Sequence, residues 1–426
     1  MLDLTTLILQ VAVIIGVSRG IALLFQKMQQ PKVIGEMFAG IMLGPSLLGW
    51  MAPKLSASLF PPSSLGYLNA LSQVGVVIYM FLVGLALKPK ELREHRHAAI
   101  LTSHVSIIVP FVLGSTLALF LYPRLCDDRV SFTSFALFVG AAMSITAFPV
   151  LARILTDRKM LGSSLGTMAI ACAAVDDVTG WCILAYIVIL VRARQEVSIP
   201  LWLTLVGLGL FLSVMLFGVK PMLRAFEQVF KREGQLSENL IALMVVVLLA
   251  SALTTEKLGL HLLFGSFLAG AIMPKEQKFV RHVLSKFESV TVVLLLPLFF
   301  AFTGLRTSVR LIHGGEMWLY CLAIIVVAIV GKLGGSMIAA RAAGSPWRDA
   351  AGLGILMNTR GLMELVILNI GLDIGILSPA LFSMFVLMAL VTTFMTTPLL
   401  ERVYPVHLIQ KEVLKASERE ITYEPA

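Results

Sequence analysis

Charged residues are scarce in this sequence of 426 residues. Asp, Glu, Lys and Arg together make up 14% of it, whereas 58% of the residues are hydrophobic. Soluble globular domains contain about 25% charged residues, so a water-soluble fold is excluded. The mean hydropathy of +0.90 indicates a polytopic membrane protein instead.

Cysteines are few as well, and their spacing suggests no site. They have no CxxC pattern and lie mostly within apolar runs, which favours small core residues over a disulfide framework or a metal site. The N-terminus lacks a basic stretch and a small-residue cleavage site, so we expect its first apolar run to be a retained helix rather than a signal peptide. The four cysteines are Cys126, Cys172, Cys182 and Cys321.

The net charge of +9 does not indicate a nucleic-acid partner, because the basic residues lie in short loops between apolar runs. Placing the N-terminus outside puts most Lys and Arg in alternate loops on the opposite side, which the positive-inside rule makes cytoplasmic. We therefore predict an all-α polytopic protein of a bacterial inner membrane, with thirteen transmembrane helices and a cytoplasmic C-terminus. The runs are 4–25, 32–50, 66–87, 98–121, 132–153, 166–191, 199–219, 239–255, 258–273, 288–305, 316–340, 349–371 and 379–400.

An odd number of spans suits two halves of inverted topology joined by one linking helix. We predict one transmembrane domain, 1–401, followed by a short cytoplasmic tail, 402–426. Within the domain we expect repeat one at about 1–192, the linker helix at about 199–219 and repeat two at about 237–400.

Two runs are interrupted at matching places of these halves. In SITAFPVLARIL the polar Ser144 and Thr146 precede Pro149, which lacks a backbone donor. An ordinary proline kink is the better interpretation of this run alone, but matched breaks in two halves favour a pair of discontinuous helices around a transport site. The second break, in GILMNTRGLMELVILNIG, holds Asn358, Thr359, Arg360 and Gly361.

Six ionisable side chains remain at membrane depth once the loops are assigned. A single Asp there costs roughly 2.5–3.5 kcal/mol on insertion scales, so such residues are usually ion or proton sites, and the alternative is a structural salt bridge. With four acids and two bases, at least one carboxylate is free to bind a cation or a proton. The acids are Glu36, Asp176, Asp177 and Glu364, and the bases are Lys332 and Arg360.

The adjacent pair Asp176 and Asp177 can support antiport, because the same oxygens hold either a proton or a cation. Oxygen ligands suit Na⁺ or K⁺. The alternative for Lys332, which is flanked by glycines, is snorkelling to an interface. Arg360 and Glu364 form either an intrahelical i,i+4 pair or part of the site, and Glu36 is interpreted as an interfacial acid at a helix start.

Four stretches, PKVIGEMFAGIMLGPSLLG, SITAFPVLARIL, AAVDDVTGW and GLGILMNTRGLMELVILNIG, resemble the monovalent cation:proton antiporters of the second branch, close to the plant and fungal cation/H⁺ exchangers. The resemblance implies inverted repeats with two crossing broken helices, an elevator-type cycle and a homodimer. It also implies that Asp177 is the principal ion and proton carboxylate, that Asp176 pairs with Lys332, and that Thr146 and Thr359 lie at the helix breaks.

A double acid, rather than Asn followed by Asp, implies electrogenic exchange by the same resemblance. Only about 25 residues follow the last run, so nucleotide or glutathione gating by a long cytoplasmic domain is not expected.

The sequence thus predicts a secondary antiporter exchanging Na⁺ or K⁺ for H⁺ in a lipid bilayer, with no enzymatic activity and no cofactor. The cation is expected at Asp177 and Asp176. The alternatives are a proton- or sodium-coupled symporter of another solute and an ion channel. An intramembrane aspartyl protease is disfavoured, because its two acids converge from different helices and these are contiguous.

Overall fold

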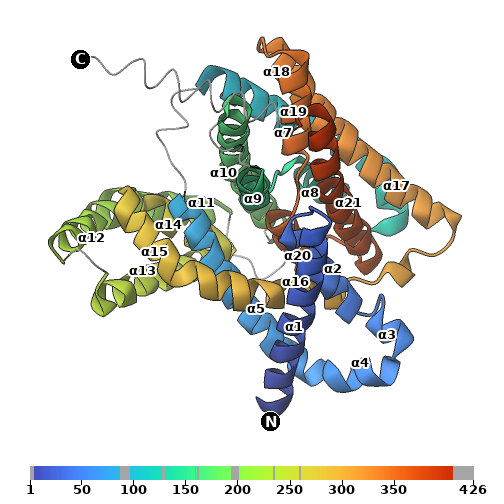
Figure 1. Cartoon of the computed structure of the whole chain (residues 1–426), viewed down its shortest axis with the longest axis horizontal. Coiled ribbons are helices and arrows are strands. Elements are labelled where there is room, and N and C mark those ends of the chain that lie inside the picture. The colour runs from blue at the N-terminus through green and yellow to red at the C-terminus, as the bar shows by residue number, and fades with distance from the viewer. Residues whose placement is uncertain are drawn as a thin grey trace. The chain divides into compact units, whose positions relative to one another are not determined.

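A computed structural model describes most of the chain, and within the described residues every regular element is a helix (Figure 1). The predicted tail, 402–426, lies outside the described residues from position 406 onward. The described residues are 4–86, 96–126, 130–158, 160, 163–192, 201–233, 236–258 and 261–405.

The helices follow the apolar runs of the sequence in order. Four of them are short π or 3₁₀ turns, labelled η. Their bounds are α1 (Leu4–Lys27), α2 (Lys32–Leu43), α3 (Leu48–Met51), α4 (Pro53–Leu59), α5 (Pro62–Ala86), α7 (Arg96–Leu125), α8 (Phe132–Ser144), α9 (Phe148–Asp157), α10 (Ser164–Arg192), α11 (Leu201–Ser213), η1 (Val214–Val219), α12 (Lys220–Glu233), α13 (Glu238–Lys257), α14 (Leu262–Ile272), α15 (Gln277–Val290), η2 (Thr291–Leu295), α16 (Leu296–Arg306), η3 (Val309–Leu311), α17 (Gly315–Ile329), η4 (Val330–Gly334), α18 (Gly335–Ala342), α19 (Trp347–Met357), α20 (Leu362–Asp373) and α21 (Pro379–Val403).

Among the described residues, eleven helices are long and apolar enough to cross a membrane, or twelve if α19 and α20 form one bent span. The chain is therefore an integral membrane protein. The predicted count of thirteen is not confirmed. The difference lies at the ninth run, where α14 has only 11 residues, fewer than the roughly 20 that span the hydrocarbon core upright.

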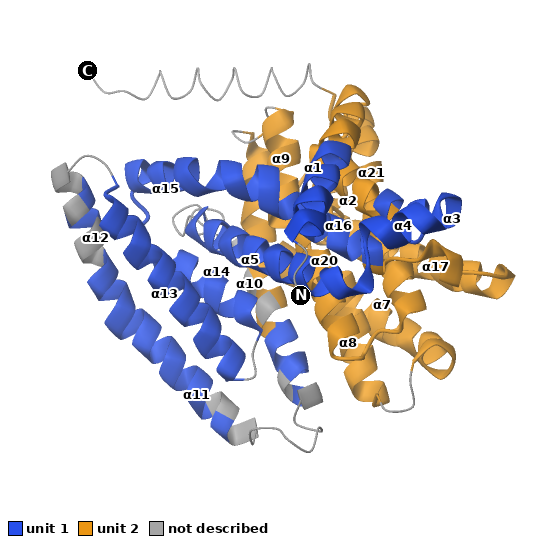
Figure 2. Cartoon of the chain, turned by 90° about the horizontal axis from the view of Figure 1, so that it is seen from below, with its two compact units in different colours: residues 1–18, 42–88, 183–305 blue, residues 19–41, 89–182, 306–426 orange. Residues whose placement is uncertain are grey.

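The chain divides into two compact units, shown in different colours in Figure 2. Unit 1 comprises residues 1–18, 42–88 and 183–305, and unit 2 comprises 19–41, 89–182 and 306–426. Each unit takes segments from both of the halves expected from the sequence. The two compact units are therefore defined by helix packing, and they do not coincide with the two halves of the sequence.

In unit 1, α5 and α14 pack closely because each presents a glycine to the other. A Cβ on Gly84 would lie 2.1 Å from the carbonyl oxygen of Phe267, and one on Gly270 would lie 2.0 Å from that of Phe81. Backbones approach this closely in membranes where small residues face each other. The side chain of Lys275 reinforces the contact, since its Nζ lies within hydrogen-bonding distance of carbonyls at the ends of both helices.

In unit 2, α7 packs against η4 and α18 in the same way. A Cβ on Gly331 would lie 2.9 Å from Cα of Pro110, and one on Gly335 would lie 3.0 Å from Cβ of Val109. A buried apolar cluster of α9, α10 and α19 fills the space beside the two helix breaks, and Leu151 is one of its fully buried members. Large apolar side chains thus hold the broken helices in place.

Candidate functional site

The fifth apolar run is broken in its middle. α8 ends at Ser144 and α9 begins at Phe148, with extended backbone between them in which Ile145 has φ −87° and ψ 135°. Pro149 occupies the first turn of α9, where its missing N–H removes no helical hydrogen bond. The proline therefore starts a new helix, and the simple proline kink is not what the structure contains.

The second break lies between α19 and α20, whose axes are bent by 42°. It touches the first break. The amide of Ala147 donates to the carbonyl of Thr359 at 3.0 Å, and Thr146 Oγ1 lies 2.9 Å from the carbonyl oxygen of Met357. Gly361 allows this approach, because a Cβ there would lie 2.5 Å from Val150.

Asp176 is surrounded by donors. Lys332 Nζ lies 2.6 Å from its Oδ2, and Thr146 Oγ1 lies 2.9 Å from the same oxygen. Ser103 Oγ donates to Oδ1 at 2.6 Å, and Ser106 Oγ lies 3.3 Å from both oxygens. One ammonium and three hydroxyls thus lie within hydrogen-bonding distance of the carboxylate of Asp176.

Lys332 is fully buried and lies in η4, a π-helical turn within the long helix of α17 and α18. Its ammonium has three donors. They reach Asp176 Oδ2, the carbonyl of Ser106 at 3.0 Å and the carbonyl of Ser144 at 2.5 Å. The ammonium therefore does not snorkel to an interface.

Asp177 differs from its neighbour in every respect except burial, which is complete for both. No side chain among the described residues donates a hydrogen bond to its carboxylate oxygens, and the backbone amide of Phe148 at the start of α9 is the donor that faces them. Successive helical residues point about 100° apart, so Asp177 cannot share the donors that hold Asp176. A buried carboxylate without a cationic or hydroxyl partner is costly as an ion and needs a proton or a cation.

Two further oxygens in the second break share this property. The side-chain oxygens of Asn358 and Thr359 are buried, and within the described part of the chain they have no hydrogen-bond partner. Ser144 does not share it, because its hydroxyl donates to the carbonyls of Gly140 at 2.7 Å and Ile107 at 3.0 Å. Neutral oxygens of this kind suit a hard monovalent cation.

Arg360 and Glu364 form a buried i,i+4 pair, with 2.8 Å between Nη1 and Oε2. The intrahelical i,i+4 pair, one of the two interpretations of Arg360 and Glu364 from the sequence, is therefore present. The guanidinium also donates to carbonyls of α8, a helix from another part of the chain. It is consequently more than an intrahelical contact.

The family model for the transmembrane part of sodium/hydrogen exchangers matches residues 11–402 of the sequence. The chain belongs to the sodium/hydrogen exchanger family. It is 44% identical over 408 residues to the Na⁺/H⁺ antiporter NhaS4 of a Synechocystis species, a match that covers 95% of this chain and 99% of that protein.

A second relative of this chain is K⁺/H⁺ antiporter 1 of Saccharomyces cerevisiae, 34% identical over 412 residues. The match covers 94% of the chain and 47% of the yeast protein, so the chain spans about half of that relative. The structure of the sodium proton antiporter MjNhaP1 from Methanocaldococcus jannaschii has the same fold, with a TM-score of 0.67, 13% identity and coverage of 96% and 99%. The predicted family is confirmed, and its named members are transporters rather than enzymes.

Two serines of the candidate site, Ser103 and Ser106, were not identified from the sequence. Ser103 and Ser106 lie three residues apart on α7, so they share one helix face toward Asp176. A polar pair at this spacing in an apolar run is a signal, but serine is common in transmembrane helices, so the signal is weak.

Glu36, interpreted from the sequence as an interfacial acid at a helix start, lies in the second turn of α2. It is the fifth residue of α2 and is buried, and its carboxylate lies 3.6 Å from a guanidinium nitrogen of Arg19. Arg19 lies inside α1 and within the first apolar run, 4–25.

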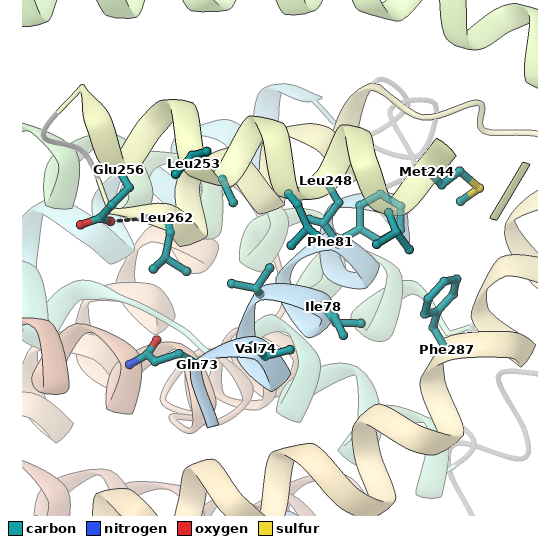
Figure 3. Close-up of a pocket in the computed structure, with 14 residues that line it drawn as sticks. Gln73, Val74, Ile78, Phe81, Met244, Leu248, Leu253, Glu256, Leu262 and Phe287 are labelled. Carbon is teal, nitrogen blue, oxygen red and sulfur yellow. Dashed lines mark hydrogen bonds between the residues drawn. The ribbon is translucent and has the colours of Figure 1, made fainter. Parts of the chain in front are cut away.

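Unit 1 contains an apolar groove of about 510 Å³ (Figure 3). Apart from Gln73 and Glu256, its lining is apolar, and Glu256 accepts a hydrogen bond from the amide of Leu262 at 3.0 Å. No group of three or more His, Cys, Asp or Glu side chains that could hold a metal ion occurs among the described residues. The candidate ion site consists of the buried oxygens of Asp177, Asn358 and Thr359, to which no side chain among the described residues donates.

Proposed function

We propose that this exchanger-family protein moves a monovalent cation in one direction and a proton in the other, and that both compete for Asp177. The observation that supports the proposal is the contrast between two adjacent carboxylates. Asp176 is held by Lys332 and three hydroxyls, whereas no side chain among the described residues donates to the oxygens of Asp177.

Exchange follows from the energetics of this one carboxylate. Protonated or cation-bound Asp177 is close to neutral, whereas empty Asp177 is a bare buried charge, which is strongly disfavoured at low dielectric. Only the two occupied forms pass readily between the two sides. Because one site holds one ligand at a time, the movement of each ion is coupled to the return of the other.

The other ligands in this proposal are the side-chain oxygens of Asn358 and Thr359, which are also buried without a partner among the described residues. Together with a carboxylate they form a hard, oxygen-only donor set that suits Na⁺ or K⁺. Both cations appear in the names of the relatives. We propose no cofactor beyond the transported ions.

The cycle that fits this site best is an elevator in which unit 2 is the transporting body. Unit 2 contains two complete predicted runs and most of a third from the first sequence half, 98–121, 132–153 and 166–182, and the last three runs of the second half, and with them both helix breaks and the aspartates. That composition supports two inverted repeats. We further propose a homodimer in the plasma membrane, with the N-terminus outside and the C-terminus in the cytoplasm, as the charge of the loops predicts.

The test is cation-driven proton movement in proteoliposomes. Wild-type protein should move protons outward or inward according to the imposed Na⁺ or K⁺ gradient. Asp177→Asn should reduce the signal to that of empty vesicles, whereas Asp157→Asn, at an exposed ion pair with Arg153 on α9, should leave it unchanged. Full exchange by Asp177→Asn would contradict the proposal.

The same vesicles separate the alternatives. Cation flux that continues without any return of protons indicates a channel. Proton movement that follows the cation in the same direction, and requires a third solute, indicates a symporter.

A further inference from the structure

The C-terminal end of α8 presents backbone carbonyls that have no partner within the helix, because α8 stops at Ser144 in the interior of unit 2. Carbonyls in this position carry the negative end of the helix dipole. Two buried cations bind them. Lys332 donates to the carbonyl of Ser144, and Arg360 donates to the carbonyls of Ala142, at 2.6 Å, and Met143.

Arg360 is itself held at three points. Glu364 Oε2 lies 2.8 Å from its Nη1. Thr393 of α21 accepts from the Arg360 amide at 2.9 Å, and its Oγ1 lies 2.6 Å from the Arg360 carbonyl. The side chain is fully buried. Both its main chain and its guanidinium are therefore fixed relative to the second helix break.

The two cations differ in what else they bind. Lys332 also contacts Asp176, so its hold on α8 is linked to the neighbouring titrating cluster. The described contacts of the Arg360 side chain are three carbonyls, of Ala142, Met143 and Ile145, and one carboxylate, that of Glu364. A guanidinium stays charged at every physiological pH.

We propose that Arg360 is a positioning residue for ion exchange. Its guanidinium clamps the end of α8 to the second break, so that Thr146 and the extended backbone beside Asp177 keep one geometry whether the site holds a cation or a proton. Glu364 orients the guanidinium. This inference rests on the proposed exchange function and extends it to a residue that touches neither aspartate.

The charged and titratable groups that face this region are Glu364 on α20, Lys332 in η4, and Asp176 and Asp177 on α10. The α8 and α21 contacts of Arg360 are carbonyls and a hydroxyl. Removing Arg360 alone therefore leaves the region one charge more negative, which favours protons and shifts the pH of half-maximal exchange to alkaline values. Removing Glu364 as well restores the charge balance but not the clamp.

The experiment compares Arg360→Gln, Arg360→Lys, Glu364→Gln and the neutral double variant Arg360→Gln/Glu364→Gln. The control is Arg153→Gln, which breaks an exposed i,i+4 pair of the same spacing. Exchange rate, apparent KM for the cation and pH profile are measured in proteoliposomes. Amide hydrogen exchange of the peptide covering 142–148 is measured in detergent.

We expect exchange to fall about 10²-fold in Arg360→Gln and in the double variant, the scale expected when reacting groups are misplaced by about 1 Å. The alkaline shift should appear in the single variant and disappear in the double. Amides of 145–148 should lose protection in both. Arg360→Lys should keep the pH profile but lose rate, and Glu364→Gln, which retains an acceptor for the guanidinium, should lose less.

The inference is overturned if the double variant and Arg360→Lys exchange at the wild-type rate and KM with protected 145–148 amides, even if their melting temperature is lower. It is also overturned if Arg153→Gln shows the same loss. Failure of the proposed function has a different signature. In that case wild-type protein moves no protons, while the amide protection of 145–148 still depends on Arg360.

Discussion

Removal of Lys332 gives a prediction whose size can be worked out from the contacts. Lys332→Ala leaves three acceptors without their donor, namely Asp176 Oδ2 and the carbonyls of Ser106 and Ser144. Breaking a buried ion pair by removing one partner costs roughly 3–5 kcal/mol. The three hydroxyls that still contact Asp176 place this case toward the lower end of that range.

The assay is thermal unfolding in detergent, followed by intrinsic fluorescence, together with the pH profile of exchange. Lys332→Ala should lower the melting temperature by several degrees and shift the pH profile, because Asp176 loses its counter-charge. The neutral double variant Lys332→Met/Asp176→Asn should regain most of the stability, since replacing both partners of a buried pair is often neutral. A Lys332→Ala protein that melts at the wild-type temperature, or a double variant no more stable than the single one, would refute the pairing.

Ser103→Ala should destabilise the protein by about 1.5–3 kcal/mol, the usual contribution of a hydrogen bond to a charged group, and should reduce exchange without abolishing it. A wild-type rate and melting temperature would contradict the contact at 2.6 Å. Gly270→Val should disrupt the packing of α5 against α14, because the new Cβ would lie 2.0 Å from a carbonyl oxygen. Size-exclusion chromatography should then show a loss of folded protein. Gly209→Val, at a position with no atom within 4 Å of the new Cβ, is the control. Burial, with the nearby Lys220, lowers the pKa of Lys275, in the loop after α14, to about 7 from its ordinary value of 10.5. Between about pH 7 and pH 10.5 the unfolded chain binds a proton at Lys275 that the folded protein lacks, so this group makes the free energy of unfolding rise with pH. The rise in melting temperature from about pH 7 to about pH 9 should therefore be smaller in Lys275→Met. An equal rise in the variant would contradict the lowered pKa.

The sequence locates the site because charge is so costly in the bilayer. Asp176, Asp177, Lys332 and Arg360 stand out as soon as the apolar runs are drawn, since little else at that depth is ionisable. The helix break beside Thr146 is also predictable, because Pro149 together with polar neighbours interrupts an apolar run. Composition and local chemistry suffice for both.

The separate roles of the two aspartates could not be predicted from the residues alone. Helical geometry states only that their side chains diverge, and which of them meets Lys332 depends on the packing of α7 and η4 against α10. Ser103 contributes through that same packing. The predicted count of spans is likewise not confirmed where a helix is shorter than the roughly 20 residues of an upright span, as α14 is.

The placement of Arg360 is likewise a tertiary property. The i,i+4 spacing to Glu364 is visible in the sequence, but its carbonyl partners on α8 lie more than 200 positions away. Long-range contacts of one side chain with the backbone leave no periodic pattern. Such contacts become visible only once the two helix breaks are brought together.

Competition between a cation and a proton for Asp177 can be measured most directly as proton release from purified protein in weakly buffered detergent solution. Addition of Na⁺ or K⁺ to the wild-type protein should release protons in a saturable manner, because the cation displaces the proton from the carboxylate. Asp177→Asn should release none, whereas Asp157→Asn should behave as wild type. Saturable release of the wild-type amount by Asp177→Asn would contradict the account.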